Sequence, residues 1–238
     1  MAKLLKGHEM NEAIYMKKVK KRLFLLFFML MFGQVLGQGL YLTEGTNGPM
    51  LRVLMGESKW GGIQNFQAGY SYEGKLDGIL AYNTAVYDGD GLERNFWTIG
   101  LEYHFMKPVL EGEYALDFIS RYNFGKFRGD GTYTEDWDNT AKEIVIGGRF
   151  GNRLMETKGF FFLPSVELLY FWRIKKFEDK IYDIIREETI NGGRVIINFD
   201  TIWVFENDLN FQFNPVLQFH EDAFVYALEV GFVWGKVQ

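Results

Sequence analysis

The amino-acid sequence predicts an all-β protein, an antiparallel up-and-down transmembrane β-barrel of about 10 strands. The first observation is that apolar side chains fall on every second residue through successive segments. The second is that these segments are about 10–13 residues long, which suits tilted strands that cross a bilayer better than the short strands of water-soluble proteins. The third is that short and long polar connections alternate between them.

The first 37 residues have the layout of an N-terminal extension followed by a secretory signal peptide. A basic stretch leads into the apolar run Leu23–Phe32, and the small residues of Val35–Gly37 offer a cleavage site, so that the mature chain begins at Gln38. Because the run is shorter than the roughly 20 residues a membrane helix needs, an uncleaved anchor is the weaker alternative. Translation that starts at Met16 instead of the first residue would give the same signal peptide.

The composition of the mature chain, residues 38–238, favours one domain and excludes several functions. The absence of cysteine removes disulfides, thiol catalysis and cysteine-based metal sites. Residues 1–37 hold seven of the 26 Lys and Arg and two of the 31 Asp and Glu, so the mature chain has 19 against 29 and a formal charge of −10. This balance argues against a nucleic-acid partner, which requires a basic surface.

Five segments in the first half of the mature chain are predicted strands. In each of them, apolar side chains occupy alternate positions, and this set of positions (one parity of the strand) faces outward. They are 50–56 (Leu51, Val53, Met55), 63–73 (Phe66, Ala68, Tyr70, Tyr72), 76–87 (Leu76, Leu80, Tyr82, Val86), 95–106 (Trp97, Ile99, Leu101, Tyr103, Phe105) and 113–123 (Tyr114, Leu116, Phe118, Tyr122). Aromatic residues recur on this parity, as in the interfacial girdles of membrane barrels.

Five further segments in the second half follow the same rule. They are 142–151 (Ile144, Ile146, Phe150), 159–173 (Phe160, Phe162, Val166, Leu168, Tyr170, Trp172), 194–206 (Val195, Ile197, Phe199, Trp203, Phe205), 208–219 (Leu209, Phe211, Phe213, Leu217, Phe219) and 223–235 (Phe224, Tyr226, Leu228, Val230, Phe232, Trp234). Residues 181–190 alternate poorly and are interpreted as an extension of an outer hairpin or as a loop. The Asn191-Gly192-Gly193 turn would also allow another strand, so 8 or 12 strands remain open.

The opposite parity would face the lumen and carries a nearly balanced set of charges. The predicted lumen network is Arg52, Glu102, His104, Asp117, Arg121, Glu143, Arg149, Glu167, Arg173, Arg194, Asp200 and Glu229. Mutual pairing explains such a set, because an unpaired buried charge is very costly. An ion-selecting constriction is the functional alternative.

The same alternation would also suit a secreted, soluble β-sandwich with the aromatic residues inside. Small residues interspersed among the charges, such as Gly100, Gly147 and Gly231, favour the barrel, because a narrow lumen must fit side chains from every wall. The long connections 88–94, 124–141 and 174–193 would then be outer loops that contact a surface partner.

Acidic residues cluster in two of these loops, but their spacing does not match a calcium-binding loop, and we expect no metal or other cofactor. The clusters are Asp88, Asp90, Asp130, Glu135, Asp136 and Asp138. His104 and Glu102 share the inward parity and are candidate catalytic groups of a lipid-modifying barrel enzyme. We interpret His104 as a member of the charge network, so no catalytic residue is assigned.

The chain resembles the small outer-membrane β-barrel family of Gram-negative bacteria, the porin-like barrels of about 8–12 strands. The resemblance covers nearly all of residues 38–238 and is one of pattern. Glu229, Gly231, Phe232 and Trp234 are similar to the C-terminal signal read by the barrel-insertion machinery, although four residues follow the last aromatic. The resemblance implies the cell outer membrane, with its lipid as partner, and a non-enzymatic structural, surface-interaction or narrow-pore role.

Overall fold

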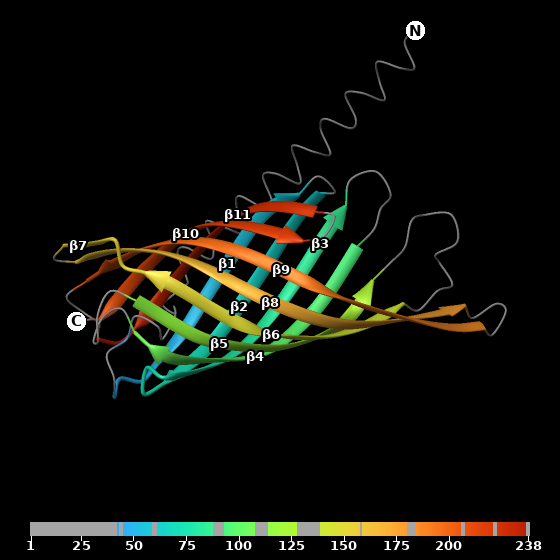
Figure 1. The fold of residues 1–238 in the computed structure, drawn as a ribbon, viewed down its shortest axis with the longest axis horizontal. Helices are drawn as coiled ribbons and strands as arrows, with labels where there is room; N and C mark the ends of the chain where they lie inside the picture. The colour runs from blue at the N-terminus through green and yellow to red at the C-terminus, as the bar shows by residue number, and fades with distance from the viewer. Residues whose placement is uncertain are drawn as a thin grey trace, which may run out of the picture. The chain divides into compact units, whose positions relative to one another are not determined.

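The structure is a computed structural model that describes residues 42, 45–58, 61–87, 93–107, 114–127, 139–157, 159–179, 184–205, 208–220 and 223–236. The predicted extension and signal peptide, residues 1–37, lie outside this part. Figure 1 shows the strands, which are β1 (Gly48–Ser58), β2 (Gly61–Tyr72), β3 (Leu76–Tyr87), β4 (Glu93–Met106), β5 (Tyr114–Phe127), β6 (Thr140–Asn152), β7 (Met155–Thr157), β8 (Phe160–Asp179), β9 (Ile184–Val204), β10 (Leu209–His220) and β11 (Ala223–Trp234).

Ten long antiparallel strands close into a barrel, which confirms the predicted fold class. Strands adjacent in the chain pair with each other, and the wall is closed where β1 meets β11, with Arg52 opposite Gly231. The three-residue β7 was not predicted and lies in the turn between β6 and β8, pairing with the start of β8. Next to it β6 pairs directly with β8, with Arg149 opposite Glu167, so the wall is continuous.

The two faces of the wall follow the predicted alternation. Outward residues such as Trp97, Ile99 and Phe105 keep 45%, 54% and 60% of their surface exposed. Their inward neighbours on β4, Glu102 and His104, are buried. An apolar outside around a polar inside is the reverse of a soluble β-sandwich, in which the apolar faces pack together. The outer wall is therefore suited to contact with lipid hydrocarbon.

β8 and β9 form a ribbon that continues past the rim of the barrel (Figure 1). They have 20 and 21 residues, whereas β1 has 11 and β4 has 14. In the part that we call the β8–β9 ribbon, residues 174–179 pair with residues 184–189. On its other side β9 pairs with β10 only from Val204 to Arg194 within the described residues.

The prediction of a loop over 174–193 is thus wrong for most of its length, and the alternative of an extended hairpin is confirmed for 184–190. Opposite charges face each other along the ribbon, with Lys175 opposite Glu188 and Lys176 opposite Glu187. Such cross-strand pairs stabilise a ribbon without apolar alternation, which explains why the sequence pattern was weak there. The predicted loops 88–94 and 124–141 are shorter too, because β4, β5 and β6 extend into them, and Asn139 is the one further residue of these loops that the structure describes.

The end of the barrel opposite the ribbon, here called the turn end, has tight connections. Glu73 and Gly74, in the three-residue connection between Tyr72 and Leu76, both have positive φ, 53° and 60°. Lys75 N donates to Tyr72 O at 3.0 Å to close the predicted turn. The chain before β1 packs here, since Gly45 N donates to Glu73 O at 3.1 Å.

Lys107, just after β4, fastens the same N-terminal segment at the turn end. Its ammonium donates to the carbonyl oxygen of the fully buried Leu42 at 2.6 Å. Burial lowers the pKa of this ammonium to about 8.

Among the described residues, no helix is long and apolar enough to cross a membrane.

The closed wall predicts heat-modifiable migration in SDS gels. An unboiled sample of the mature protein should migrate at a different apparent mass from a boiled one, because a closed wall leaves no strand edge for detergent to attack. Boiled and unboiled samples of the membrane fraction are compared on one gel. A single band at one mass in both samples, with the protein in the soluble fraction, would contradict the barrel.

Candidate functional site: the packed lumen

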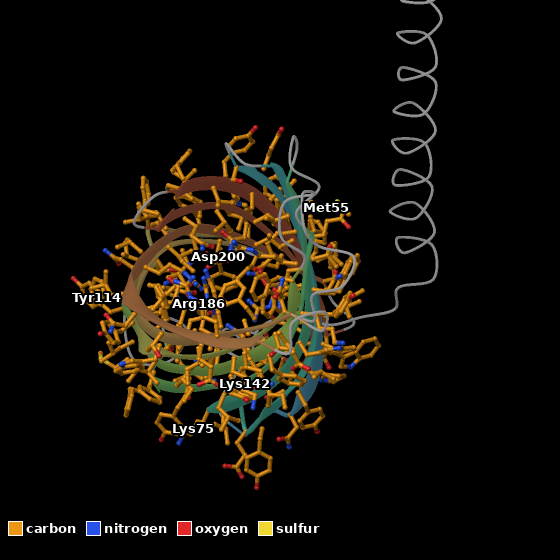
Figure 2. The ribbon with its side chains drawn as sticks, turned by 90° about the vertical axis from the view of Figure 1, so that its right-hand side faces the viewer. Met55, Lys75, Tyr114, Lys142, Arg186 and Asp200 are labelled. Carbon is orange, nitrogen blue, oxygen red and sulfur yellow. The ribbon has the colours of Figure 1, made fainter. Side chains whose placement is uncertain are left out.

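Side chains from all sides of the wall fill the lumen in layers. Figure 2 looks along the barrel from the ribbon end and shows them crowding the interior, with Asp200 among them and Tyr114 outside. Because inward residues recur at every second position, each strand contributes polar and apolar groups at successive depths. From the turn end to the ribbon end these form an apolar cluster, a polar ring, a second apolar layer and a polar chain.

The polar ring is a series of hydrogen bonds and ion pairs that passes through nine of the ten barrel strands. Its members are Asp77, His104, Asp117, Arg149, Glu167, Asn198, Asn214, Glu229 and Arg52, from β3, β4, β5, β6, β8, β9, β10, β11 and β1. His104 lies between two carboxylates, with Nε2 at 3.0 Å from Asp77 and Nδ1 at 2.8 Å from Asp117. The ring ends with Arg52 at 3.5 Å from Glu229.

Arg149 is the hub of the ring, and its guanidinium contacts three carboxylates. It donates to Glu167 Oε1 at 2.6 and 3.0 Å, to Asp117 Oδ2 at 3.3 Å and to Glu102 Oε2 at 3.3 Å. Only 2% of its surface is exposed. Arg121 shares two of these partners, with Nη2 at 2.8 Å from Glu102 and 3.5 Å from Glu167. Two arginines and three carboxylates therefore form one buried electrostatic unit.

An apolar layer lies above the ring and spans the barrel. Its members are buried residues from five strands: Ile119, Val145, Leu169, Phe171, Ile196 and Val216. Along β8, Leu169 and Phe171 stand between the ring residue Glu167 and the next charged residue, Arg173. A second apolar cluster, which includes Phe161 and Ile202, lies on the turn-end side of the ring. The sequence analysis missed these apolar inward residues, because they share the parity of the charged ones.

A polar chain lies on the ribbon side of the apolar layer and crosses seven strands. It comprises Asn65, Asn83, Thr98, Asn123, Glu143, Arg173 and Arg194. Asn123 faces Glu143 in the strand register, and Asn123 Nδ2 donates to Glu143 Oε1 at 2.7 Å. Arg173 Nε donates to Glu143 Oε2 at 2.8 Å. Arg194 lies 3.6 Å from Glu143 Oε1.

All twelve residues of the predicted lumen network make polar contacts, although they fall into separate groups. Asp200, for example, accepts a hydrogen bond from Gln212 Nε2 at 2.6 Å. Asp77, next to the turn before β3, is not among the twelve predicted residues, yet it is buried against His104. The sequence analysis also missed Asn123 and Asn214 as inward residues of the two networks. Strict inward parity, applied to every neutral amide as well as to the charges, would have found them.

His104 is enclosed by the residues with which it pairs, as expected for a residue with a structural role. His104 and Glu102 do not pair with each other, since His104 bonds Asp77 and Asp117 while Glu102 bonds the two arginines. The side chains of His104 and both its partners are wholly buried. Among the described residues, no group of three or more His, Asp or Glu could hold a metal ion. The acidic loop clusters lie outside these residues.

Comparison with solved structures bears on the fold. The chain is similar to the β-domain of the Bordetella autotransporter Brka, with 14% identity, a TM-score of 0.54, and coverage of 80% of this chain and 99% of that chain. It is similar to the translocator domain of autotransporter NalP from Neisseria meningitidis, with 9% identity, a TM-score of 0.55, and coverage of 94% and 96%. The fold is that of an outer-membrane β-barrel. No family model and no curated protein matches the sequence.

Barrels of this fold with an apolar outer wall are proteins of the cell outer membrane, and the chain is assigned to that membrane accordingly. At these identities the likeness extends to the fold alone. The inward side chains of this outer-membrane barrel, and how they pack, follow from its own sequence and not from the fold.

The hub position of Arg149 predicts a large loss of stability on its removal. Arg149→Met should lower the free energy of unfolding by about 3–5 kcal/mol, because three buried carboxylates lose a partner at once. Urea unfolding of the barrel in lipid vesicles, followed by tryptophan fluorescence, measures the change. Lys142→Met, an outward substitution on the same strand, is the matched control. Equal transition midpoints for both variants would contradict the hub role.

Proposed function

We propose that the mature chain is a non-enzymatic outer-membrane barrel with a closed lumen, which serves as a stable membrane scaffold with a surface-directed ribbon. The observation that carries this proposal is the sequence of layers inside the wall. A ring of hydrogen bonds and ion pairs through nine strands lies directly below an apolar layer that contains the fully buried Phe171. Ions would have to break the ring and pass a dehydrated apolar zone, which is a strong barrier to conduction.

The β8–β9 ribbon supports the surface-directed part of the role. In outer-membrane barrels the short turns are periplasmic and the longer connections are extracellular. The ribbon extends from the end opposite the tight Glu73-Gly74 turn, so in this orientation it projects from the cell. Ile174 and Ile185 on it are 47% and 57% exposed, which gives a surface partner apolar contact area next to charge.

Conductance tests the closed lumen. The folded wild-type barrel in a planar lipid bilayer should give no single-channel steps, whereas Arg149→Gly with Phe171→Gly, which thins both layers, should leak ions. Phe150→Gly is the matched control, because Phe150 is an outward phenylalanine that is 55% exposed. Regular steps from the wild-type barrel would refute the closed lumen and favour a narrow pore.

A lipid-modifying enzyme that uses His104 is the competing function, and substitution of this residue separates the two. His104→Asn should leave the lipid profile of the outer membrane unchanged, because the imidazole is enclosed by Asp77 and Asp117. The same variant should lose stability, since two buried carboxylates lose a shared donor. Mass spectrometry of extracted lipids, compared with wild-type and deletion strains, measures the first effect. A lipid species lost in both the variant and the deletion strain would favour the enzyme.

A further inference from the structure

The outer surface of the wall has a groove on the side formed by β5, β6, β8 and β9. Its volume is about 670 Å³, which is within the range of small-molecule sites. The outward residues that line it are apolar or aromatic, and Leu168 among them is 62% exposed. These outward residues are Phe118, Ile146, Leu168, Tyr170, Gly193 and Val195.

Two outward glycines leave the space of the groove unfilled. Gly148 lies between Phe118 and Leu168 in the strand register. One row closer to the ribbon end, Gly193 lies opposite Tyr170. A Cβ added at Gly193 would meet no atom within 4 Å. The wall therefore lacks a side chain at two positions in adjacent rows, while large side chains stand beside both.

The groove lies at the depth of the acyl chains of one membrane leaflet. Toward the ribbon end it is followed by a row in which Tyr122, Ile144 and Trp172 face one another, and tyrosine and tryptophan mark the membrane interface. Lys142, in the next row, precedes Gly148 by six residues. Six residues span about 20 Å along a strand and about 14 Å of depth at a tilt of about 45°. This is roughly half of the hydrocarbon thickness, so Lys142 lies at the level of the headgroups.

Lys142 is an exposed cation above the groove. Its register partners are uncharged, since it faces Phe124 on β5 and Ile174 on β8. The residues two positions further toward the ribbon end on these strands, Lys126 and Lys176, bring no negative charge to it. An anionic headgroup above the groove would therefore meet an ammonium without a carboxylate in the adjoining register positions.

Lys176 differs from Lys142, because nearby carboxylates offset its charge. Its ammonium pairs with Glu178 at 3.0 Å, and Glu187 faces it across the ribbon. Of the two lysines, Lys142 is accordingly the one expected to discriminate between lipid headgroups.

We propose that this groove binds one acyl chain of an anionic, phosphate-bearing lipid, with Lys142 against the headgroup. The occupant is a lipid because the groove continues the apolar wall that faces hydrocarbon in the outer membrane. An unfilled groove forfeits dispersion contacts, which a flexible chain restores. Apolar surfaces do not attract each other hydrophobically within hydrocarbon, so selectivity comes from the fit of the chain and from the contact with the headgroup. The inference does not depend on whether the lumen is closed.

The first test fills the groove. Native mass spectrometry of the folded mature barrel in detergent, titrated with phosphatidylglycerol, should show one molecule bound more tightly than any further ones. Gly193→Leu should weaken this binding about tenfold, because the new side chain takes the place of the acyl chain. Gly78→Leu is the matched control, since Gly78 is an outward glycine between Tyr70 and Leu101 with the same room for a Cβ. It should bind the lipid as the wild type does.

The second test removes the headgroup contact. Phosphatidylglycerol is compared with phosphatidylcholine of the same acyl chains, which carries no net charge. Lys142→Gln should retain lipid binding and reduce the preference for phosphatidylglycerol about fivefold, as expected for one lysine at the membrane surface. Lys176→Gln is the control, because Glu178 already offsets its charge. The heat-dependent gel shift verifies that each variant is folded.

Wild-type protein without a tightly bound lipid, or equal affinities in Gly193→Leu and Gly78→Leu, would overturn the groove as a lipid site. Equal losses of preference in Lys142→Gln and Lys176→Gln would overturn the role of Lys142. A dimer that Gly193→Leu abolishes would replace the lipid by a second copy of the chain. Conductance is measured separately, so a conducting barrel that still binds the lipid would refute the closed lumen and leave the groove standing.

Discussion

The requirement that every charge inside a narrow wall finds a partner governs this structure. A barrel of ten strands is small enough for side chains from opposite walls to meet, and water cannot solvate each charge separately. Arg149 shows the consequence, since one guanidinium contacts Glu102, Asp117 and Glu167, from three strands. These pairs fix the relative positions of β4, β5, β6 and β8, and so also the place where β6 meets β8 around the short β7.

The apolar layers depend on the same constraint. Pairing within the ring withdraws polar groups from the space above it, where Phe171 and Leu169 then pack without exposing polar atoms. The packing of the lumen is thus a property of particular side chains. The solved autotransporter domains share the course of the backbone with this barrel, but at 14% and 9% identity they carry no information on its interior.

The two ends of the barrel differ in how their chain segments are held. At the turn end, the connections are tight, and the hydrogen bond from Lys107 to Leu42 holds the segment before β1 against the barrel. At the ribbon end, β8 and β9 continue past Arg194, the last residue of β9 that pairs with β10 within the described residues. The polar ring and the apolar layers lie within the wall, whereas the β8–β9 ribbon is held by the pairing of its own two strands.

The sequence by itself determined the strand periodicity, the outward apolar wall, the approximate bounds of ten strands and the inward position of all twelve predicted charges. These follow from alternation, which is local and strict in a strand. It did not determine the ribbon, because cross-strand charge pairs such as Lys175 and Glu188 replace apolar alternation there. Tertiary structure alone decided which charges meet, that Asp77 joins His104, and that Phe171 fills the lumen. Those outcomes depend on strand register and barrel closure, which bring together residues far apart in the chain, as with Arg52 and Glu229.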